Sequence, residues 1–239
     1  MSKKILGIIP ARGGSKGIKD KNIFNLNGKP LIWYTIKAAK DSNILSDFIV
    51  STDSKKIKTI SEKLGAKVPF IRPASLAKDR SNAIPTLKHA LRKYEKLNDV
   101  KVDYVVMLQP TAPLRLSSDI DRAIDQLIKS NADSIISVTN VNNNHPIKMK
   151  IIKRGYLYDY KESKIENPAR QSLSPVFIVN GAIYATKRDI LMNNNSLKGF
   201  KSLPYEMPDD RSVNIDSISD IVLANHYLIK SSIDDKPKI

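Results

Sequence analysis

The residues best suited to chemistry lie in one short loop, Arg12 to Lys21, which follows an apolar run at 5–9. The loop holds four basic side chains, one acidic side chain and glycines at positions 13, 14 and 17. Glycines permit positive φ angles and a close approach of the backbone to a ligand, and N–H groups beside Arg and Lys suit an anion. The spacing matches neither a Walker P-loop nor a GxGxxG motif, and a solvated surface turn is the alternative. Because the loop directly follows a predicted strand, the sequence favours a phosphate-binding loop.

Further polar residues follow other predicted strands. Gln109 and Arg115 come after the apolar run 104–108, and Arg115 is expected to tie this loop to a helix rather than to touch a ligand. Asn214 and Asp216 would project on the same side of an extended segment, where two oxygen ligands could hold Mg²⁺. The N-cap of the next helix is an equally good role for Asp216, and a cap is the commoner role for Asp53.

The elements that must position these residues alternate along the first 138 residues. Apolar runs predict strands, and apolar residues spaced by three and four predict helices. Such alternation is typical of an α/β protein, a mostly parallel sheet flanked by helices, with ligands at the carboxyl ends of the strands. The predicted strands are 5–9, 47–53, 67–70, 104–108, 134–138 and 176–184, and the predicted helices carry the apolar stripes 31–38, 57–64, 84–94, 120–127 and 218–228, with a short helix at 189–192 and Ser117 or Ser118 as a cap.

The rhythm changes between residues 140 and 175, where two short runs flank Arg154-Gly155 as in a hairpin. About 30 residues are too few to be stable alone, so we expect this inserted segment to pack on another surface. A contact between two copies of the chain is the natural interpretation. The whole chain, 1–239, would otherwise be one domain.

Composition limits the kind of protein. The chain has 239 residues, 41% apolar and 27% charged, as in an ordinary soluble protein. Without a long apolar span or a leader-like cleavage site, we expect a cytoplasmic protein with no membrane contact. With no cysteine, a metal would be held by oxygen ligands or by one of only three histidines, and Mg²⁺ fits that set of ligands. The net charge of +16 calls for an anionic partner, but the basic residues are dispersed, so a nucleotide is favoured over nucleic acid.

Taken together, the motifs resemble those of the acylneuraminate cytidylyltransferases, the CMP-sialic acid synthetases and their legionaminic acid relatives. The resemblance spans nearly the whole chain and rests on the segments 9–17 with Lys21-Asn22, Ser51-Thr52-Asp53, Arg72-Pro73, 108–115, 180–184 and Asn214-Ile215-Asp216. It implies a nucleotide-diphospho-sugar transferase fold (Rossmann-like), with a small inserted dimerisation subdomain and a homodimer. It also implies Mg²⁺-dependent transfer of CMP from CTP to the C2 hydroxyl of a nine-carbon 2-keto sugar acid, a nonulosonic acid, with release of pyrophosphate.

The resemblance also implies roles for single residues. Catalysis would fall to Arg12, Lys16, Lys21 and Asp216, and the metal to Asp216 and Asn214, where the family usually has a second aspartate. The nucleotide would contact Arg12, Ser15, Lys16, Lys21, Asn22, Arg72, Ser81, Asn82 and Asn180. The sugar acid would contact Gln109, Lys148, Arg170 and Tyr184. Whether Asp216 or a metal-bound hydroxide takes the sugar's proton stays open.

Three alternatives remain at this level. A pseudaminic acid cytidylyltransferase is the nearer enzyme alternative, and a KDO-type cytidylyltransferase is another, although its loop normally reads differently from residues 12–17. A basic nucleic-acid-binding protein without catalysis would account for the charge. A catalytically silent homologue that only binds nucleotide would account for Asn214 in place of the second aspartate.

Overall fold

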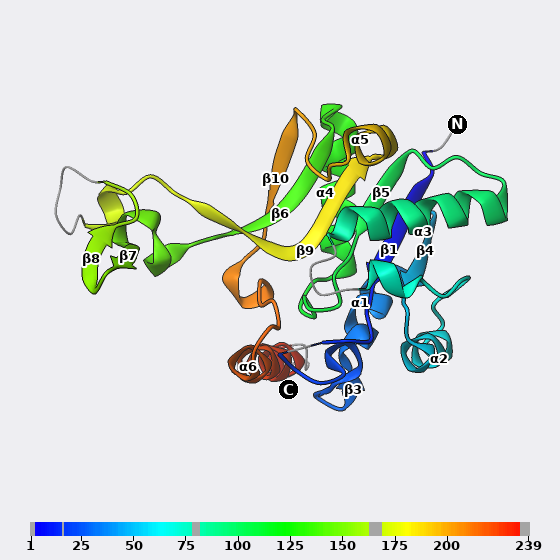
Figure 1. Ribbon diagram of the computed structural model, residues 1–239, viewed down its shortest axis with the longest axis horizontal. Helices are drawn as coiled ribbons and strands as arrows, with labels where there is room; N and C mark the ends of the chain where they lie inside the picture. Colours follow the sequence, from blue (N-terminus) through cyan, green and yellow to red (C-terminus); the bar gives the residue numbers. More distant parts are fainter. Residues whose placement is uncertain (1–2, 16, 78–81, 163–168, 235–239) are drawn as a thin grey trace.

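A six-stranded sheet forms the centre of the computed structural model, which describes residues 3–15, 17–77, 82–162 and 169–234 (Figure 1). Across the sheet the strands follow the order β10 (Ser202–Glu206), β6 (Ser134–Asn140), β9 (Phe177–Lys187), β5 (Tyr104–Met107), β1 (Ile5–Pro10) and β4 (Asp47–Ser51). All neighbouring pairs are parallel except those of β9, which runs antiparallel to both β5 and β6. The predicted α/β class and the central place of β9 are therefore confirmed.

Helices cover both faces of this sheet, because its central strands are apolar on both sides. Side chains alternate along β1, so that Ile5 and Ile9 face one core cluster while Leu6 and Ile8 face the other. The first cluster is covered by α1 (Leu31–Lys40), α2 (Lys55–Lys63) and α4 (Ser117–Ser130). The second is covered by α3 (Ala83–Asn98) and α5 (Arg188–Asn194).

A third apolar cluster fixes the two polar segments relative to each other. It joins Ile18, in the basic loop, to Val213 and Ile215, which precede α6 (Ile218–Asp234), and all three are buried. Full burial of an isoleucine contributes about 1.5–3 kcal/mol. The loop continues into η1 (Lys21–Ile23) and the small ladder of β2 (Asn25–Leu26) and β3 (Lys29–Pro30). This cluster therefore determines how close the loop and the segment 213–216 lie.

One buried carboxylate joins three elements away from the basic loop. Asp119, on α4, is fully buried and accepts hydrogen bonds from the Leu116 N–H (2.9 Å) and the Tyr205 hydroxyl (3.0 Å), and it pairs with Arg211 of η6 (Asp209–Arg211). Burial and this carboxylate raise the pKa of Tyr205 to about 12, so the phenol remains a donor. Leu116 is the N-cap of α4, which corrects the expected cap at Ser117 or Ser118. The Asp119 carboxylate does the capping, since it accepts the Leu116 N–H from inside the helix.

Two other local predictions need correction. Instead of a strand at 67–70, the structure has two isolated bridges, from Lys67 to Ile49 of β4 and from Ile71 to Thr52 just after β4. A 3₁₀ helix, η2 (Ala74–Leu76), follows. Strand β10, at the edge of the sheet, was not predicted, because Pro204 interrupts its apolar pattern. Gly65 ends α2 as expected, with a positive φ of +85°.

Between β6 and β9 the chain leaves the body and forms an arm, described for residues 141–162 and 169–176, that projects to one side (Figure 1). The predicted hairpin is present there, with β7 (Lys150–Lys153) antiparallel to β8 (Tyr156–Asp159). The rest of the described arm consists of short 3₁₀ turns, η3 (Asn142–Asn144), η4 (Pro146–Lys148) and η5 (Arg170–Ser172). In the part of the chain that the structure describes, no helix is long and apolar enough to cross a membrane.

Candidate functional site

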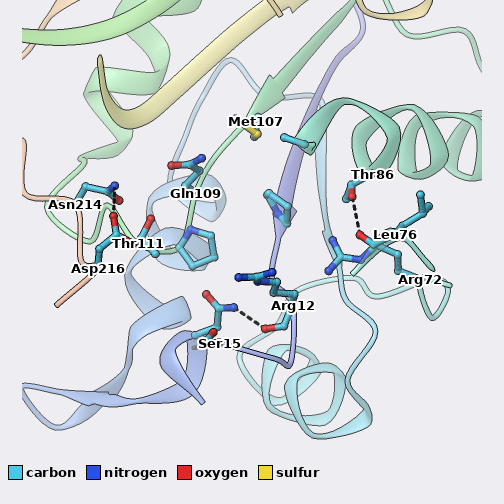
Figure 2. A pocket seen from close by; sticks show the side chains of 14 residues that line it. Arg12, Ser15, Arg72, Leu76, Thr86, Met107, Gln109, Thr111, Asn214 and Asp216 are labelled. Carbon is cyan, nitrogen blue, oxygen red and sulfur yellow. Dashed lines mark hydrogen bonds between the residues drawn. The ribbon is translucent and has the colours of Figure 1, made fainter. Parts of the chain in front are cut away.

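A cavity of about 400 Å³ opens at the carboxyl ends of β1 and β5, the edge of the sheet at which the sequence predicts a ligand (Figure 2). Most of its walls come from the basic loop, the start of α3, the segment after β5 and the segment before α6. Its lining is Pro10, Arg12, Ser15, Asn22, Arg72, Leu76, Ala83, Thr86, Met107, Gln109, Pro110, Thr111, Asn214 and Asp216. Seven of the residues predicted from the sequence thus meet in one place: Arg12, Ser15, Asn22, Arg72, Gln109, Asn214 and Asp216.

The loop after β1 is held from behind by hydrogen bonds to its backbone. The Gly13 N–H donates to Asp53 Oδ1 (3.0 Å), and the buried Asn22 donates from Nδ2 to the Arg12 carbonyl (2.9 Å). Ser54 is the N-cap of α2, so the cap role expected for Asp53 is wrong. Asn22 lines the cavity while fixing the loop, which makes it part of the frame as well as of the surface.

Glycines matter in this loop for space rather than for backbone angle. None of Gly13, Gly14 and Gly17 has a positive φ, contrary to the expectation. A Cβ at Gly13 would lie 2.9 Å from the Ser54 Cβ, and one at Gly17 would lie 2.8 Å from the Asp216 carbonyl oxygen. The absence of side chains at these positions allows the loop to lie directly on its neighbours.

Lys21 joins the loop to the opposite wall of the cavity. Its Nζ donates to Asp216 Oδ1 (2.7 Å) and to the Ile215 carbonyl (2.9 Å). The Lys21 side chain is only 16% exposed, whereas that of Asp216 is 70% exposed. Asp216 is not the N-cap of α6, because Asp220 accepts the backbone N–H groups of Asp216 and Ser217. The carboxylate of Asp216 is thus available at the cavity while one of its oxygens holds the lysine.

Arg72 supplies a second cation, from the other side. Its side chain is 3% exposed, and Nη2 lies 3.3 Å from Asp53 Oδ1. Burial lowers the pKa of Arg72, the Asp53 carboxylate opposes this change, and the nearby Arg12 adds to it. Its Nε is buried and without a hydrogen-bond partner among the described residues. A ligand oxygen or carbonyl in the cavity would satisfy that donor.

Asn214 and Asp216 form a pair of oxygen-bearing side chains. Asn214 Nδ2 donates to Asp216 Oδ2 (3.2 Å), as Figure 2 shows, and Asn214 Oδ1 is buried without a hydrogen-bond partner in the described part of the chain. An orphaned amide oxygen beside an exposed carboxylate is a donor set that fits a hard cation such as Mg²⁺. Among the residues described, no group of three or more His, Cys, Asp or Glu gathers as a metal cluster. Any metal here would therefore keep other ligands from substrate or water.

Gln109 is positioned through its backbone by a buried arginine. Arg115 is 2% exposed, and its Nη1 donates to the Ala182 carbonyl (2.7 Å) and the Gln109 carbonyl (3.4 Å). Burial lowers the pKa of Arg115, and the Asp119 carboxylate opposes this change. Arg115 has a structural role as predicted, but it ties the loop to strand β9 rather than to a helix. Gln109 is consequently presented to the cavity from a rigid base.

Three predicted contact residues lie elsewhere. The buried Asn180, expected at the ribose, uses its amide inside the protein, accepting from Ser137 Oγ (2.6 Å) and donating to Ser212 Oγ (3.0 Å). Asn82 caps α3 through its side chain, which accepts the Ile84 N–H. Tyr184 packs against the core cluster beneath α3 and α5, and burial raises its pKa. None of these three side chains lines the cavity.

The remaining predicted residues are not placed at the cavity by a single chain. Lys16 and Ser81 lie outside the described residues. Lys148 and Arg170 belong to the 3₁₀ turns η4 and η5 of the arm, which projects away from the body (Figure 1). Conversely, Thr86 and Met107 line the cavity without being predicted. Met107 precedes Gln109 by two residues, a spacing that signals a shared side of the strand end, whereas no sequence signal marks Thr86.

Comparison with known proteins decides the family. The profile of the family described as Cytidylyltransferase matches residues 6–227. The chain belongs to the cytidylyltransferase family. Its resemblance to the acylneuraminate and legionaminic acid branch is confirmed by named relatives at 31–34% identity.

Some relatives of this cytidylyltransferase match it over nearly their whole length, and others are about twice as long. It is 34% identical to the post-translational flagellin modification protein B of Campylobacter coli, over 95% of both chains. It is 34% identical to the CMP-N,N'-diacetyllegionaminic acid synthase of Legionella pneumophila, over 94% of this chain and 96% of that one. It is 31% identical to the N-acylneuraminate cytidylyltransferase of Streptococcus agalactiae serotype V, over 98% of this chain but only 55% of that one.

A solved structure supports the fold. A CMP:2-keto-3-deoxy-manno-octonic acid synthetase complexed with CTP matches with a TM-score of 0.72 at 17% identity, over 96% of this cytidylyltransferase and 100% of that chain. The nucleotidyltransferase fold expected from the motifs is therefore confirmed.

Replacing Gly181 with alanine is expected to damage the site of this cytidylyltransferase. Gly181 has φ +78°, and a Cβ there would lie 2.6 Å from Gln109 Oε1. The left-handed backbone alone costs roughly 1–2 kcal/mol for a residue with a Cβ. Thermal unfolding should show that loss, and turnover should fall by more than the loss of folded protein explains. Gly14→Ala is the control, because a Cβ there meets nothing within 4 Å; equal effects of the two changes would contradict the argument.

Proposed function

We propose that the protein transfers CMP from CTP to the C2 hydroxyl of a nonulosonic acid and releases pyrophosphate. The observation that carries this proposal is the cavity of about 400 Å³, in which the basic loop forms one wall and the pair Asn214 and Asp216 forms the opposite wall. Relatives named as CMP-legionaminic acid and N-acylneuraminate enzymes support the same reaction. In that reaction the hydroxyl oxygen bonds to the α-phosphorus of CTP. The bond between the α-phosphorus and the oxygen that bridges to the β-phosphate breaks, and pyrophosphate leaves.

The chain's own residues serve this reaction mainly by positioning and by neutralising charge. Arg12, Ser15 and Lys21 would hold the triphosphate, together with Lys16, which lies outside the described residues. Asn22 keeps the loop in shape through its bond to the Arg12 carbonyl. Arg72, buried and held by Asp53, offers an unsatisfied donor where the cytosine would lie.

Asp216 and Asn214 would hold Mg²⁺. The exposed carboxylate of Asp216 and the unpartnered amide oxygen of Asn214 are the oxygens available for it. When bound, the ion would supply positive charge beside the phosphates. Lys21, bonded to the same carboxylate, keeps that oxygen oriented toward the loop.

The sugar acid would occupy the side of the cavity near Gln109, and we propose that a second copy of the chain completes it. The arm carries large apolar residues that a single chain leaves exposed, among them Ile152 (75%), Tyr156 (70%) and Leu157 (66%). Contiguous exposed apolar surface of this kind marks a protein interface. Pairing of arms between two copies would bring Lys148 of one copy and the turn that contains Arg170 toward the other's cavity, where a cation suits a carboxylate.

Negative charge introduced into the apolar surface of the arm should therefore dissociate the proposed dimer. The double substitution Ile152→Glu and Leu157→Glu introduces carboxylates at two cross-strand partners of the hairpin. We expect size-exclusion chromatography with light scattering to give a dimer for the wild type and a monomer for this variant. The exposed Lys161→Glu should leave the dimer intact. A wild-type protein that is monomeric at all concentrations would refute the proposed assembly.

The reaction is tested by pyrophosphate release. The purified protein is given CTP, Mg²⁺ and in turn N-acetylneuraminic, legionaminic, pseudaminic or deoxyoctulosonic acid, with ATP replacing CTP as control. We expect release that needs CTP and is strongest with one of the first two acids. Because CTP is a cytoplasmic metabolite, we also infer that the protein acts there. Absence of release with every acid would refute the proposal, and steeply salt-dependent binding of nucleic acid without base preference would favour the non-catalytic alternative.

A further inference from the structure

A second cavity, of about 590 Å³, lies on the outer side of α3 and is not used by the proposed reaction. Its polar lining is Lys88, His89, Arg92, Lys93, Lys96 and Asn195. The spacings of three and four place the α3 residues along one face of the helix, and Asn195 is the C-cap of α5. The volume is within the range of about 300–1,000 Å³ that small-molecule sites occupy.

The cavity is cationic, and among the residues that the structure describes its lining contains no acidic side chain. Lys88 donates to two neutral acceptors, Asn195 Oδ1 (2.5 Å) and the Met192 carbonyl (2.9 Å). Within the described ranges, no ion pair with a carboxylate is formed by any of the four cations, Lys88, Arg92, Lys93 and Lys96. A helix face that is merely solvated usually intersperses acids among such cations. Here four positive charges on one face are left for an anion.

Part of the cavity lining is apolar. Leu76, Ile84 and Pro85 contribute to its lining. The His89 ring lies edge-on to Phe70, with ring centroids 5.2 Å apart, and its Nδ1 is buried without a partner among the described residues. Burial, Lys93 and Arg72 lower the pKa of His89, so the imidazole is neutral at pH 7. A ligand here would meet apolar side chains, the neutral His89 ring and a row of cations.

We propose that this cavity is a second binding site, for a small organic anion with an apolar or aromatic body. The cations of α3 would bind its charged group, and the side chains of Leu76, Ile84 and Pro85 would cover its body.

The two cavities share one wall. Leu76 lines both, and Thr86, which lines the first, donates from Oγ1 to the Leu76 carbonyl (3.2 Å). A ligand against Leu76 therefore contacts the same 3₁₀ helix that borders the nucleotide cavity. Binding at the second site and binding of CTP should be linked, a statement that rests on the proposed function.

Two fluorescent probes that differ by one sulfonate test the site. The probes are 8-anilinonaphthalene-1-sulfonate and its uncharged analogue N-phenyl-1-naphthylamine, titrated into the full chain. We expect Arg92→Glu with Lys93→Glu to weaken binding of the sulfonate at least ten-fold and to change binding of the uncharged analogue less than two-fold. Lys198→Glu with Lys230→Glu is the control of equal charge change and should match the wild type. Circular dichroism checks that each variant folds.

Each outcome decides a claim. Equal sulfonate affinity in the three proteins, or equal loss for both probes, would overturn the second site. The titration is then repeated at saturating CTP, where a change in sulfonate affinity of more than two-fold supports the linkage and an unchanged affinity overturns it. Failure of the protein to bind CTP at all would count against the proposed function and leave the probe comparison intact.

Discussion

Replacing Lys21 with alanine is expected to lower kcat/KM for pyrophosphate release by about 10²–10³, the usual cost of losing one preorganised donor at developing charge. The reason is geometric. Lys21 Nζ is held at 2.7 Å from Asp216 Oδ1 and 2.9 Å from the Ile215 carbonyl, so the ammonium is fixed between the basic loop and the proposed metal ligands before substrate arrives. Preorganised charge of this kind requires no rearrangement during the reaction.

The control for this prediction lies two residues away. Lys19 is exposed in the same loop, and Lys19→Ala carries the same loss of charge without the fixed position. Its kcat/KM should stay within about three-fold of the wild type, since an exposed, screened charge contributes little. Circular dichroism and thermal unfolding should show both variants folded. Near-normal turnover of Lys21→Ala would remove Lys21 from the catalytic group, and an equal loss in both variants would reduce its role to net charge.

Replacing Asp119 with alanine is expected to destabilise the fold by about 3–5 kcal/mol, the cost of removing one partner from a buried ion pair. Asp119 is fully buried and satisfies Arg211, the Tyr205 hydroxyl and the Leu116 N–H at once. Without it, the N-terminus of α4 loses its cap and β10 loses its tie to the helix layer. Because Arg211 is only three residues before Asn214, activity should also fall at temperatures where the variant is still folded.

Denaturant unfolding measures this effect against a matched residue of the same helix. Asp125 forms an exposed pair with Lys129 one turn away, and Asp125→Ala should cost less than about 0.5 kcal/mol. A melting temperature lowered by roughly 10 °C for Asp119→Ala is the corresponding thermal result. If the two variants unfold alike, the buried carboxylate does not have the structural role described above.

The sequence predicted the frame of the site better than its details. Apolar runs that stop at Pro10 or Gln109 show where strands end. Because parallel strands end at the same edge of a sheet, the residues that follow these strands come close together. The role of Asp216 could not be decided from the local sequence. Asp220, four residues later, is a second acidic residue that can accept the N–H groups at the start of α6, and in the structure it does so. The apolar cluster shared by Ile18 and Ile215 brings Lys21 to Asp216, across nearly the length of the chain.

Two of the predicted contact residues that do not line the cavity share a physical reason. Asn180 and Tyr184 belong to β9, and the direction in which β9 enters the sheet determines whether its polar atoms face the cavity or the interior. A period of two in an apolar strand does not reveal that direction. Strand β10 was missed because a proline at a sheet edge is harmless to pairing, although it breaks a sequence pattern.

The antiparallel direction of β9 has a consequence for how the arm is attached. At the base of the arm Asn140 pairs with Phe177, and the Val141 N–H donates to the Val176 carbonyl (3.0 Å). Topologically, everything between these residues is the loop of a single β-hairpin, whose length does not alter the order or register of the sheet. A two-residue turn could close the same ladder. The arm is therefore an exchangeable module, and lineages could lengthen, replace or lose it while the nucleotide half of the protein stays unchanged.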